Sequence, residues 1–227
     1  MEIRKTFNTT KKEIKSKKFN IFIGISLGNK WFTKENLREY LNWALKNTKD
    51  KVLFLIVDKI HAINYKIRNK YNSIRALKIA LKNGKKVKKI ILELVSELPK
   101  EKQNKIKILR WEEYEKYDKF YKKYAKIIYN EFETNSKFKK QILNLMKKMI
   151  RDREFSEEDY QNFSKYLLEE FIILYSGINY KFNSYKFYIY PQDILINQFI
   201  EKLQQGKVFK ELNKKLPKEK VALAIIN

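Results

Sequence analysis

The stretch Phe22 to Phe32, FIGISLGNKWF, decides the fold class of this chain. The residues from Asn20 to Ile25 are apolar or β-branched with few charges, which predicts a buried strand. The strand runs into Ser26, and Gly28 and Asn29 tolerate positive φ, so we expect a tight turn there. A serine at the carboxyl end of a central strand lies where open α/β sheets bind their ligands. The alternative is a turn that only caps the next helix, and this stretch alone does not separate the two.

Strands and helices alternate along the rest of the chain. We expect strands at about 19–26, 51–57, 106–109, 185–190 and 221–226, and helices at about 33–48, 59–98 with a break near 70–72, 111–150, 157–175 and after Pro191. Strands separated by helices of crossover length predict an α/β fold with a mostly parallel central sheet and helices on both faces. No linker or repeat marks a boundary, so residues 1–227 are expected to form a single domain with a basic N-terminal arm at 1–18.

The composition excludes several kinds of site. The 227 residues include no cysteine and one histidine, which leaves no disulfide, no thiolate nucleophile and no Cys/His metal centre. No apolar run reaches the length of a membrane span, and the N-terminus has no signal-peptide pattern. The absence of cysteine suits a reducing compartment, so a cytoplasmic protein is expected.

The charge points to a polyanionic partner. The chain has 51 Lys and Arg against 26 Asp and Glu, a net charge of +25, which favours nucleic acid above all. On a helical wheel over residues 72–98, six cations fall in an arc of about 100°, and five apolar residues lie opposite. The cations are Arg75, Lys78, Lys82, Lys85, Lys86 and Lys89, and the apolar residues are Leu77, Ala80, Val87, Ile91 and Leu94. This basic stripe suits a phosphate backbone, although an ordinary solvated lysine face is the alternative and Gly84 weakens the helix.

A second helix carries a carboxylate on its apolar face. The segment 156–175, SEEDYQNFSKYLLEEFIILY, predicts a helix that begins with a capping box at Ser156. On the wheel Glu170 falls inside the apolar arc, four residues after Tyr166, whereas Glu169 points away toward solvent. A carboxylate on a buried face needs a partner. Glu170 is therefore either a structural salt bridge to a lysine or the ligand of a substrate ammonium group, with Tyr166 beside it.

Four features in this order resemble the cyclodipeptide synthase family over about residues 19–200. They are the strand end GISLGN with Ser26, the basic helix, Tyr166-x-x-x-Glu170, and a strand that ends in Tyr190-Pro191. Enzymes of that family convert two aminoacyl-tRNAs into a cyclic dipeptide, a diketopiperazine. The resemblance implies a Rossmann-like domain similar to the catalytic domain of class I tyrosyl- and tryptophanyl-tRNA synthetases.

The resemblance also implies roles for individual residues. Ser26 is expected to be the nucleophile of a ping-pong mechanism that passes through an aminoacyl enzyme and then a dipeptidyl enzyme. Tyr166 and Glu170 are expected to hold the aminoacyl ammonium group, with Glu170 also needed when the second residue is joined. Tyr190 is expected to assist proton transfer during cyclisation.

The family has two subgroups, and this chain mixes their features. One subgroup pairs an Asn shortly after the serine with Tyr-His on the later strand, whereas the other has Tyr-Pro there. The Tyr190-Pro191 pair favours the second subgroup, and the role of Asn29 stays open. The substrate-binding set is Phe22, Gly24, Asn29, Phe54, Ile56 and Pro191, of which Phe22, Gly24, Phe54 and Ile56 are expected to line an apolar pocket for the first aminoacyl group.

An aminoacyl ester arrives already activated, so such an enzyme needs no ATP site, and the sequence has no G-x-x-x-x-G-K loop. We therefore expect two aminoacyl-tRNAs as partners, no cofactor, no metal, no membrane contact and a monomer. His61 is interpreted as structural, and the base that deprotonates Ser26 is not identified.

Two other functions stay open. A non-catalytic RNA-binding module would explain the charge but neither Glu170 nor the turn at Ser26. A serine acylase of simple esters would match the G-x-S-x-G spelling of Gly24–Gly28, but its catalytic triad requires a suitably placed histidine, and His61 precedes any downstream acid.

Overall fold

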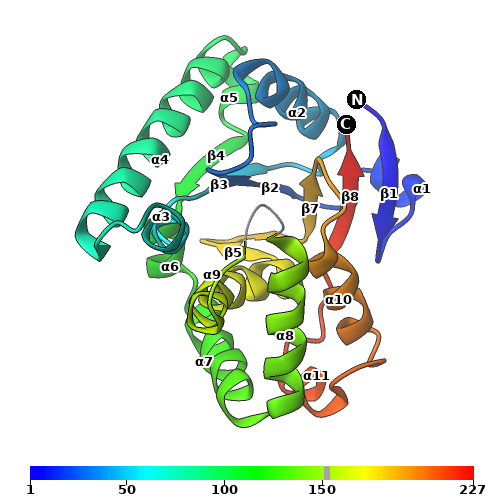
Figure 1. Ribbon diagram of the computed structural model, residues 1–227. Coiled ribbons are helices and arrows are strands. Elements are labelled where there is room, and N and C mark those ends of the chain that lie inside the picture. The colour runs from blue at the N-terminus through cyan, green and yellow to red at the C-terminus, as the bar shows by residue number, and fades with distance from the viewer. Residues whose placement is uncertain (151–153) are drawn as a thin grey trace.

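A six-stranded sheet forms the centre of the protein (Figure 1). The computed structural model describes residues 1–150 and 154–227. The sheet strands are β1 (Ile3–Phe7), β2 (Ile21–Ser26), β3 (Val52–Val57), β4 (Ile106–Arg110), β7 (Phe187–Tyr190) and β8 (Ala222–Ile226), and a separate hairpin pairs β5 (Ile178–Tyr180) with β6 (Asn183–Tyr185). The strand order is β1-β8-β7-β2-β3-β4, and every neighbouring pair is parallel except β1 with β8. The predicted α/β class with a mostly parallel sheet is confirmed.

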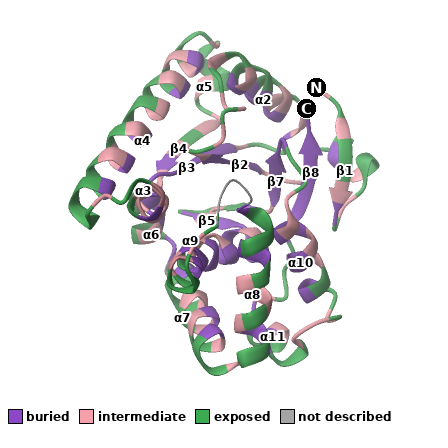
Figure 2. Cartoon of the chain, viewed as in Figure 1, coloured by how far each residue is buried: buried purple, intermediate pink, exposed green. Residues whose placement is uncertain are grey.

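Helices cover both faces of this sheet, and the buried residues follow the sheet and the inner sides of the helices (Figures 1 and 2). One face is covered by α1 (Lys11–Lys15), α2 (Lys34–Asn47) and α4 (Ser73–Ser96). The other face is covered by α3 (Ala62–Asn69), α6 (Trp111–Tyr117), α7 (Lys119–Thr134), α8 (Ser136–Met149), α9 (Glu157–Ser176), α10 (Leu195–Gln204) and α11 (Lys210–Lys215), while α5 (Lys100–Gln103) connects α4 to β4. None of the helices in the described ranges is long and apolar enough to cross a membrane.

The two central strands are buried on both sides. All of β3 and every residue of β2 except Ser26 are buried, as is typical of parallel strands that carry helices on both faces. Their side chains alternate between two cores. Phe22 packs in the core that includes α9, whereas Ile23 packs in the core that includes α2 and α4. Residues two positions apart on β2 therefore share one face of the sheet.

The chain changes direction in the sheet between β2 and β7. From β2 it continues outward to β3 and β4, and it later returns to β7 and β8 on the other side of β2. The ladder between β2 and β7 ends at the pair Ile23–Ile189, although β2 continues to Ser26 and β7 to Tyr190. The strands part beyond Ile23 and Ile189, and open α/β sheets bind ligands at such a switch point.

The sequence pattern did not predict β1 and α1, which lie in the segment described above only as a basic arm. Strand β1 pairs with β8 at the sheet edge, and exposed Arg4 and Lys5 interrupt its apolar pattern. Charged residues are common on edge strands because they discourage pairing with another chain. The hairpin was also missed, because its strands are three residues each and the predicted strand at 185–190 is divided at Lys186.

Packing explains why residue 84, in the middle of α4, is a glycine, although a glycine there weakened the helix prediction. An added Cβ would lie 2.2 Å from Oδ2 of Asp58. Asp58 is fully buried and accepts a hydrogen bond from Arg110 Nε at 2.5 Å, and Arg110 also donates to the carbonyl of Leu81 at 3.2 Å. Only glycine lets α4 approach this buried ion pair so closely.

We expect Gly84→Ala to lower the free energy of unfolding by about 3 kcal/mol, because the new methyl group must displace a buried, paired carboxylate. Urea denaturation measures the change. Lys85→Ala, at an exposed position on the same helix, is the control and should change stability by no more than about 0.5 kcal/mol. Equal, small effects of both substitutions would contradict this account of Gly84.

Candidate active site

The turn predicted after Ser26 is present. The backbone N–H of Asn29 donates to the carbonyl of Ser26 at 3.2 Å, and the side chain of Asn29 accepts from the N–H of Trp31 at 3.0 Å. Neither Gly28 nor Asn29 adopts a positive φ. The expectation that the turn uses Gly28 for a positive φ is therefore wrong. A Cβ on Gly28 would instead lie 3.1 Å from Cε1 of His61, and the turn packs directly on that ring.

An apolar cavity of about 150 Å³ opens beside Ser26. Its walls come from β2, β3, β7, α6, α8, α9 and the loop before α10. Most of the lining side chains are aliphatic or aromatic, and the polar groups are those of Ser26, Tyr166, Glu170, Tyr188 and Tyr190. A cavity of this kind binds an apolar group and orients it with a few polar atoms.

Tyr166 and Glu170 form a hydrogen-bonded pair on α9. The Tyr166 hydroxyl donates to Oε1 of Glu170 at 2.8 Å, because residues four apart share one side of a helix. Burial raises the pKa of Glu170 to about 7, against the lowering effect of the Tyr166 hydrogen bond. Burial also raises the pKa of Tyr166, the charge of Glu170 adds to this, and a hydrogen bond with Ser26 opposes it. Glu170 therefore changes its protonation near neutral pH, and a bound cation would favour its charged form.

Tyr190 is held in place by Asn29 of the turn after Ser26. Asn29 Nδ2 donates to the Tyr190 hydroxyl oxygen at 3.2 Å, which connects the segment after β2 to the end of β7. Burial raises the pKa of Tyr190 to about 12, and the Asn29 hydrogen bond lowers it. The phenol is therefore neutral at physiological pH and can both donate and accept a proton.

Gly24 makes room for Tyr188, which the sequence pattern did not identify as a cavity residue. A Cβ on Gly24 would lie 3.2 Å from both Cε2 and the hydroxyl oxygen of Tyr188. The Tyr188 ring stacks on Phe22 with centroids 4.9 Å apart. The missing side chain in β2 is thus filled by a ring from β7.

The structure contradicts part of the predicted pocket. Phe54 and Ile56 pack in the core under α2 and α4, on the other side of the sheet, so the expectation that they line the cavity is wrong. In the ladder Gly24 is aligned with Leu55, and Ser26 with Val57. Leu55 and Val57 therefore line the cavity in their place.

Of the other four predicted substrate-binding residues, two line the cavity and two do not. Phe22 and Gly24 line the cavity. Pro191 is buried directly after Tyr190 but does not line it, and Asn29 reaches the site through Tyr190.

Glu169 does not point to solvent, and that prediction is wrong. It is partly buried, and the Tyr129 hydroxyl of α7 donates to it at 2.7 Å. Burial and the nearby charge of Glu115 raise the pKa of Glu169 to about 7, while Lys59 lowers it. Glu169 does face away from the cavity that Glu170 lines.

His61 is buried beside the site. Burial and the charge of Arg68 lower its pKa to about 4, so the ring is neutral at physiological pH. Its ring meets the Tyr166 ring edge-on, with centroids 6.0 Å apart. Within the described part of the chain, no group of three or more His, Cys, Asp or Glu side chains could hold a metal ion.

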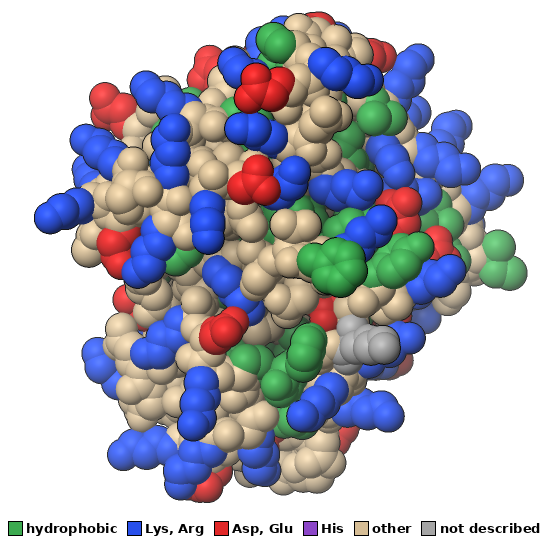
Figure 3. All heavy atoms as spheres, turned by 180° about the vertical axis from the view of Figure 1, so that it is seen from behind, with side chains coloured by type: hydrophobic (Ala, Val, Ile, Leu, Met, Phe, Trp, Pro, Cys, Tyr) green, Lys and Arg blue, Asp and Glu red, His purple; other side chains and the backbone are tan. Residues whose placement is uncertain are grey.

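All six cations of the predicted basic stripe are exposed on α4, and among the residues that the structure describes none of them pairs with a carboxylate. Leu77 is 38% exposed, so its predicted place on the buried side is wrong, and the buried side is formed by Ala76, Ala80, Gly84, Ile91 and Leu94. Lysine and arginine side chains are spread over the rear surface of the molecule and outnumber the acidic ones among them (Figure 3).

The chain is similar to known proteins along most of its length. The family model for cyclodipeptide synthase matches residues 4–175, more than half of the chain. No curated protein matches the sequence.

Solved structures with low sequence identity share the fold. A cyclodipeptide synthase from Staphylococcus haemolyticus has a TM-score of 0.75 and 19% identity over 98% of both chains. A Mycobacterium tuberculosis protein, whose structure relates cyclodipeptide synthetases to type I tRNA synthetases, has a TM-score of 0.74 and 18% identity over 99% of this chain and 94% of that chain. A cyclodipeptide synthase from Candidatus Glomeribacter gigasporarum, solved bound to Phe-tRNAPhe, has a TM-score of 0.57 and 19% identity over 92% of this chain and 88% of that chain.

We expect Glu170→Gln to change how stability depends on pH. The pKa of Glu170 is about 7 in the folded protein, above the value of about 4.3 in an unfolded chain. The wild-type free energy of unfolding therefore loses a contribution as pH rises between these two values, and the variant has no such loss. The free energy of unfolding of the variant minus that of the wild type should increase by about 3 kcal/mol between about pH 4.5 and pH 8 and then stay constant.

Urea denaturation at several pH values measures this difference. Glu158→Gln, at an exposed position on the same helix, is the matched control. A pH dependence as large in that control as in the Glu170 variant would contradict the assignment.

Proposed function

The chain belongs to the cyclodipeptide synthase family, and we propose that it joins the aminoacyl groups of two aminoacyl-tRNAs through an ester on Ser26. The observation that carries this proposal is that four polar side chains from three elements line one apolar cavity. These are Ser26 of β2, Tyr166 and Glu170 of α9, and Tyr190 of β7. Each has the chemistry that one step of the reaction requires.

The first step is acylation. Ser26 Oγ attacks the ester carbonyl of the first aminoacyl-tRNA, the bond from that carbon to the ribose oxygen breaks, and the ribose oxygen takes up the proton. The aminoacyl ammonium group pairs with Glu170, whose carboxylate is favoured once a cation enters the cavity. Tyr166 fixes the carboxylate by its hydrogen bond, and the side chain of the amino acid occupies the apolar part of the cavity.

The second and third steps form two peptide bonds. Glu170 accepts a proton from the amine of the Ser26-bound residue, and this amine attacks the ester carbonyl of the second aminoacyl-tRNA. The bond from that carbon to the ribose oxygen breaks, the ribose oxygen takes up a proton, and the second tRNA leaves a dipeptidyl enzyme behind. The new terminal amine then attacks the Ser26 ester, which closes the ring and restores the hydroxyl. Tyr190, neutral because burial raises its pKa to about 12, transfers the proton in this closure.

We assign the chain to the Tyr-Pro subgroup on the basis of Tyr190-Pro191, and we assign Asn29 a positioning role. Its amide holds the Tyr190 hydroxyl oxygen at 3.2 Å, and its backbone closes the turn at Ser26. The lining of Phe22, Leu55 and Val57 favours an apolar first amino acid. Residues 1–227 act as one catalytic domain and as a monomer.

The tRNA binds through the basic stripe of α4. Its six exposed cations suit the phosphate backbone, and the relative from Candidatus Glomeribacter gigasporarum was solved with a tRNA. A non-catalytic RNA-binding module would need the stripe, but it would have no use for a buried carboxylate next to a serine in an apolar cavity.

Bacteria that express the chain should release a cyclic dipeptide into the medium, which mass spectrometry identifies. Ser26→Ala should abolish both the product and the labelled protein ester formed from radioactive aminoacyl-tRNA, because only the covalent step is lost. Ser184→Ala, at an exposed position of the hairpin, is the control and should keep both. If Ser26→Ala makes product at near the wild-type rate, Ser26 is not the nucleophile. If the wild-type chain binds aminoacyl-tRNA but forms neither ester nor product, it is a binding module.

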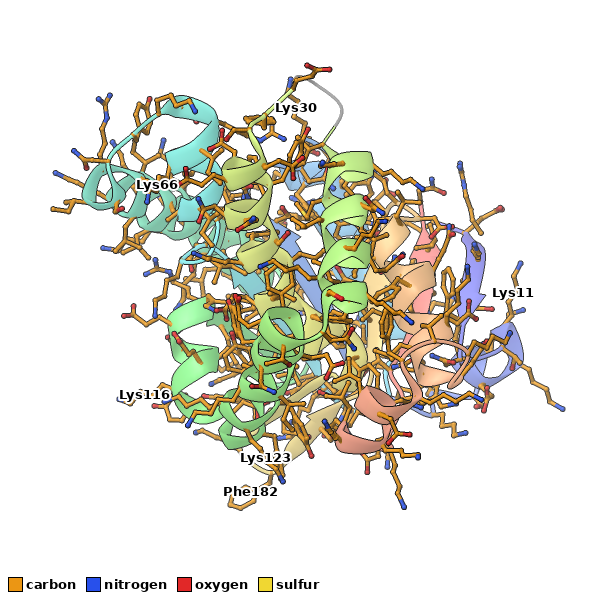
Figure 4. The ribbon with its side chains drawn as sticks, turned by 60° about the horizontal axis from the view of Figure 1, so that its bottom comes forward. Lys11, Lys30, Lys66, Lys116, Lys123 and Phe182 are labelled. Atoms are coloured by element: carbon orange, nitrogen blue, oxygen red, sulfur yellow. The ribbon has the colours of Figure 1, made fainter. Side chains whose placement is uncertain are left out.

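Lys82→Ala/Lys86→Ala should raise KM for every aminoacyl-tRNA at physiological salt, because phosphate contacts carry no sequence information. Lower salt should largely restore KM, and the slope of log affinity against log salt should become shallower by up to about 2. The product should not change. Lys11→Ala/Lys15→Ala is the charge-matched control. It removes two exposed charges from α1, which lies at the right edge of Figure 4. Wild-type behaviour of the Lys82/Lys86 variant over the whole salt range would show that the stripe is only a solvated surface.

A further inference from the structure

A second concavity adjoins the turn after Ser26. It has a volume of about 420 Å³, and its walls are Gly28, His61, Asn64, Tyr65, Arg68 and Asn69. Apart from Gly28, these residues belong to α3 or precede it directly. None of them lines the apolar cavity, so the two spaces are separate.

His61 and Tyr166 divide the two spaces. The His61 ring lines the second concavity and lies edge-on to the Tyr166 ring, which lines the apolar cavity. Gly28, two residues after Ser26, lies against the same His61 ring. A substrate ester whose amino acid lies in the apolar cavity therefore has its alcohol portion next to this second concavity.

The second concavity is preorganised. Tyr65 is fixed at both ends, because its hydroxyl oxygen accepts from Asn83 Nδ2 of α4 at 2.9 Å and its ring meets the His61 ring with centroids 5.0 Å apart. Asn64 Nδ2 lies 3.3 Å from Nδ1 of His61, and the carbonyl oxygen of the Asn64 side chain has no partner among the described residues. The Arg68 guanidinium lies 5.7 Å from the ring centroid of Phe163, which anchors it against α9.

These groups have the chemistry that recognises an unpaired nucleoside. Proteins bind splayed bases by stacking them on aromatic rings or guanidinium planes and by hydrogen bonds to their edges. Tyr65 supplies a ring, Arg68 a guanidinium, and Asn64 and Asn69 supply amides that both donate and accept.

The charge around this concavity is suited to phosphate. Among the residues that the structure describes, no Asp or Glu lines it, and the exposed side chains of Lys66 on α3 and Lys30 after the turn extend from the same end of the molecule (Figure 4). A nucleoside bound there would bring its 5′ phosphate among cations.

We propose that this concavity binds the 3′-terminal adenosine of the aminoacyl-tRNA, with the base on Tyr65 and its edge hydrogen-bonded by Asn64 and Asn69. The inference rests on the proposed function, since that function places a nucleoside ester at Ser26. It gives His61 a role as the wall between the amino-acid side of the site and the nucleoside side.

Two hydrolysis-resistant probes test the proposal. One is 3′-leucylamino-3′-deoxyadenosine, and the other is the same compound without the base. Calorimetric titration gives the ratio of their dissociation constants, which isolates the contribution of the base. The wild-type protein should bind the complete probe at least about fivefold more tightly, because the stacking of a base on an aromatic ring contributes about 1–3 kcal/mol, or about 5- to 150-fold.

Tyr65→Ala should remove most of this preference, and Tyr65→Phe should retain it, because phenylalanine keeps the ring. Asn64→Ala should reduce it in part. Tyr71→Ala removes a partly exposed tyrosine that does not line the concavity, and it is the control that should keep the wild-type ratio. Because the ratio compares two probes on one variant, a general loss of folding would weaken both and leave the ratio unchanged.

A wild-type protein with no preference for the complete probe would overturn the proposal, and so would a preference that survives in both Tyr65→Ala and Asn64→Ala. The readout is independent of catalysis. Acylation of Ser26 without a base preference would reject the nucleoside site alone, and a base preference without acylation would reject the proposed function alone.

Discussion

The site depends on the parting of two parallel strands. β2 and β7 are hydrogen-bonded only as far as the pair Ile23–Ile189, and each continues beyond it to a residue that lines the cavity, Ser26 or Tyr190. A sheet paired to its end would bring these strands to within about 5 Å and leave no space between them. Gly24 lies at the point of separation, where its missing side chain is occupied by the Tyr188 ring. The cavity therefore results from the topology of the sheet and one glycine rather than from a flexible loop.

The electrostatics of the site oppose those of the surface. The chain carries a net charge of +25, mostly in exposed lysines, whereas the cavity holds a carboxyl group that burial keeps half-protonated near pH 7. Such a group is costly to ionise by itself and inexpensive to ionise beside a cation. In the proposed reaction, the ammonium group of an aminoacyl ester supplies the missing counterion, and the positive surface attracts the tRNA. One substrate would thus match both the acidic cavity and the positive surface.

Much of the fold and of the candidate site could be predicted from the sequence, because these features depend on residues that are close together in the chain. The strand at 21–26, the start of α2 near residue 33 and the four-residue spacing of Tyr166 and Glu170 depend only on neighbouring residues. Phe54 and Ile56 were assigned to the wrong face because alternation defines two faces of β3, and only its register with β2 shows which one Ser26 shares. The burial of Glu169 and the exposure of Leu77 depend in the same way on which helices pack on α9 and α4, and a helical wheel contains no such information.

The rotation of α9 about its axis is the last constraint on the chemistry. Consecutive helical residues point about 100° apart, so Glu169 and Glu170 cannot both face the cavity. Tyr129 of α7 holds Glu169 on one side, and Tyr166 holds Glu170 on the other. The Tyr166 ring in turn lies against His61, which supports the turn after Ser26 through its contact with Gly28. Ser26 and Glu170 come from elements far apart in sequence, and these contacts fix their relative position.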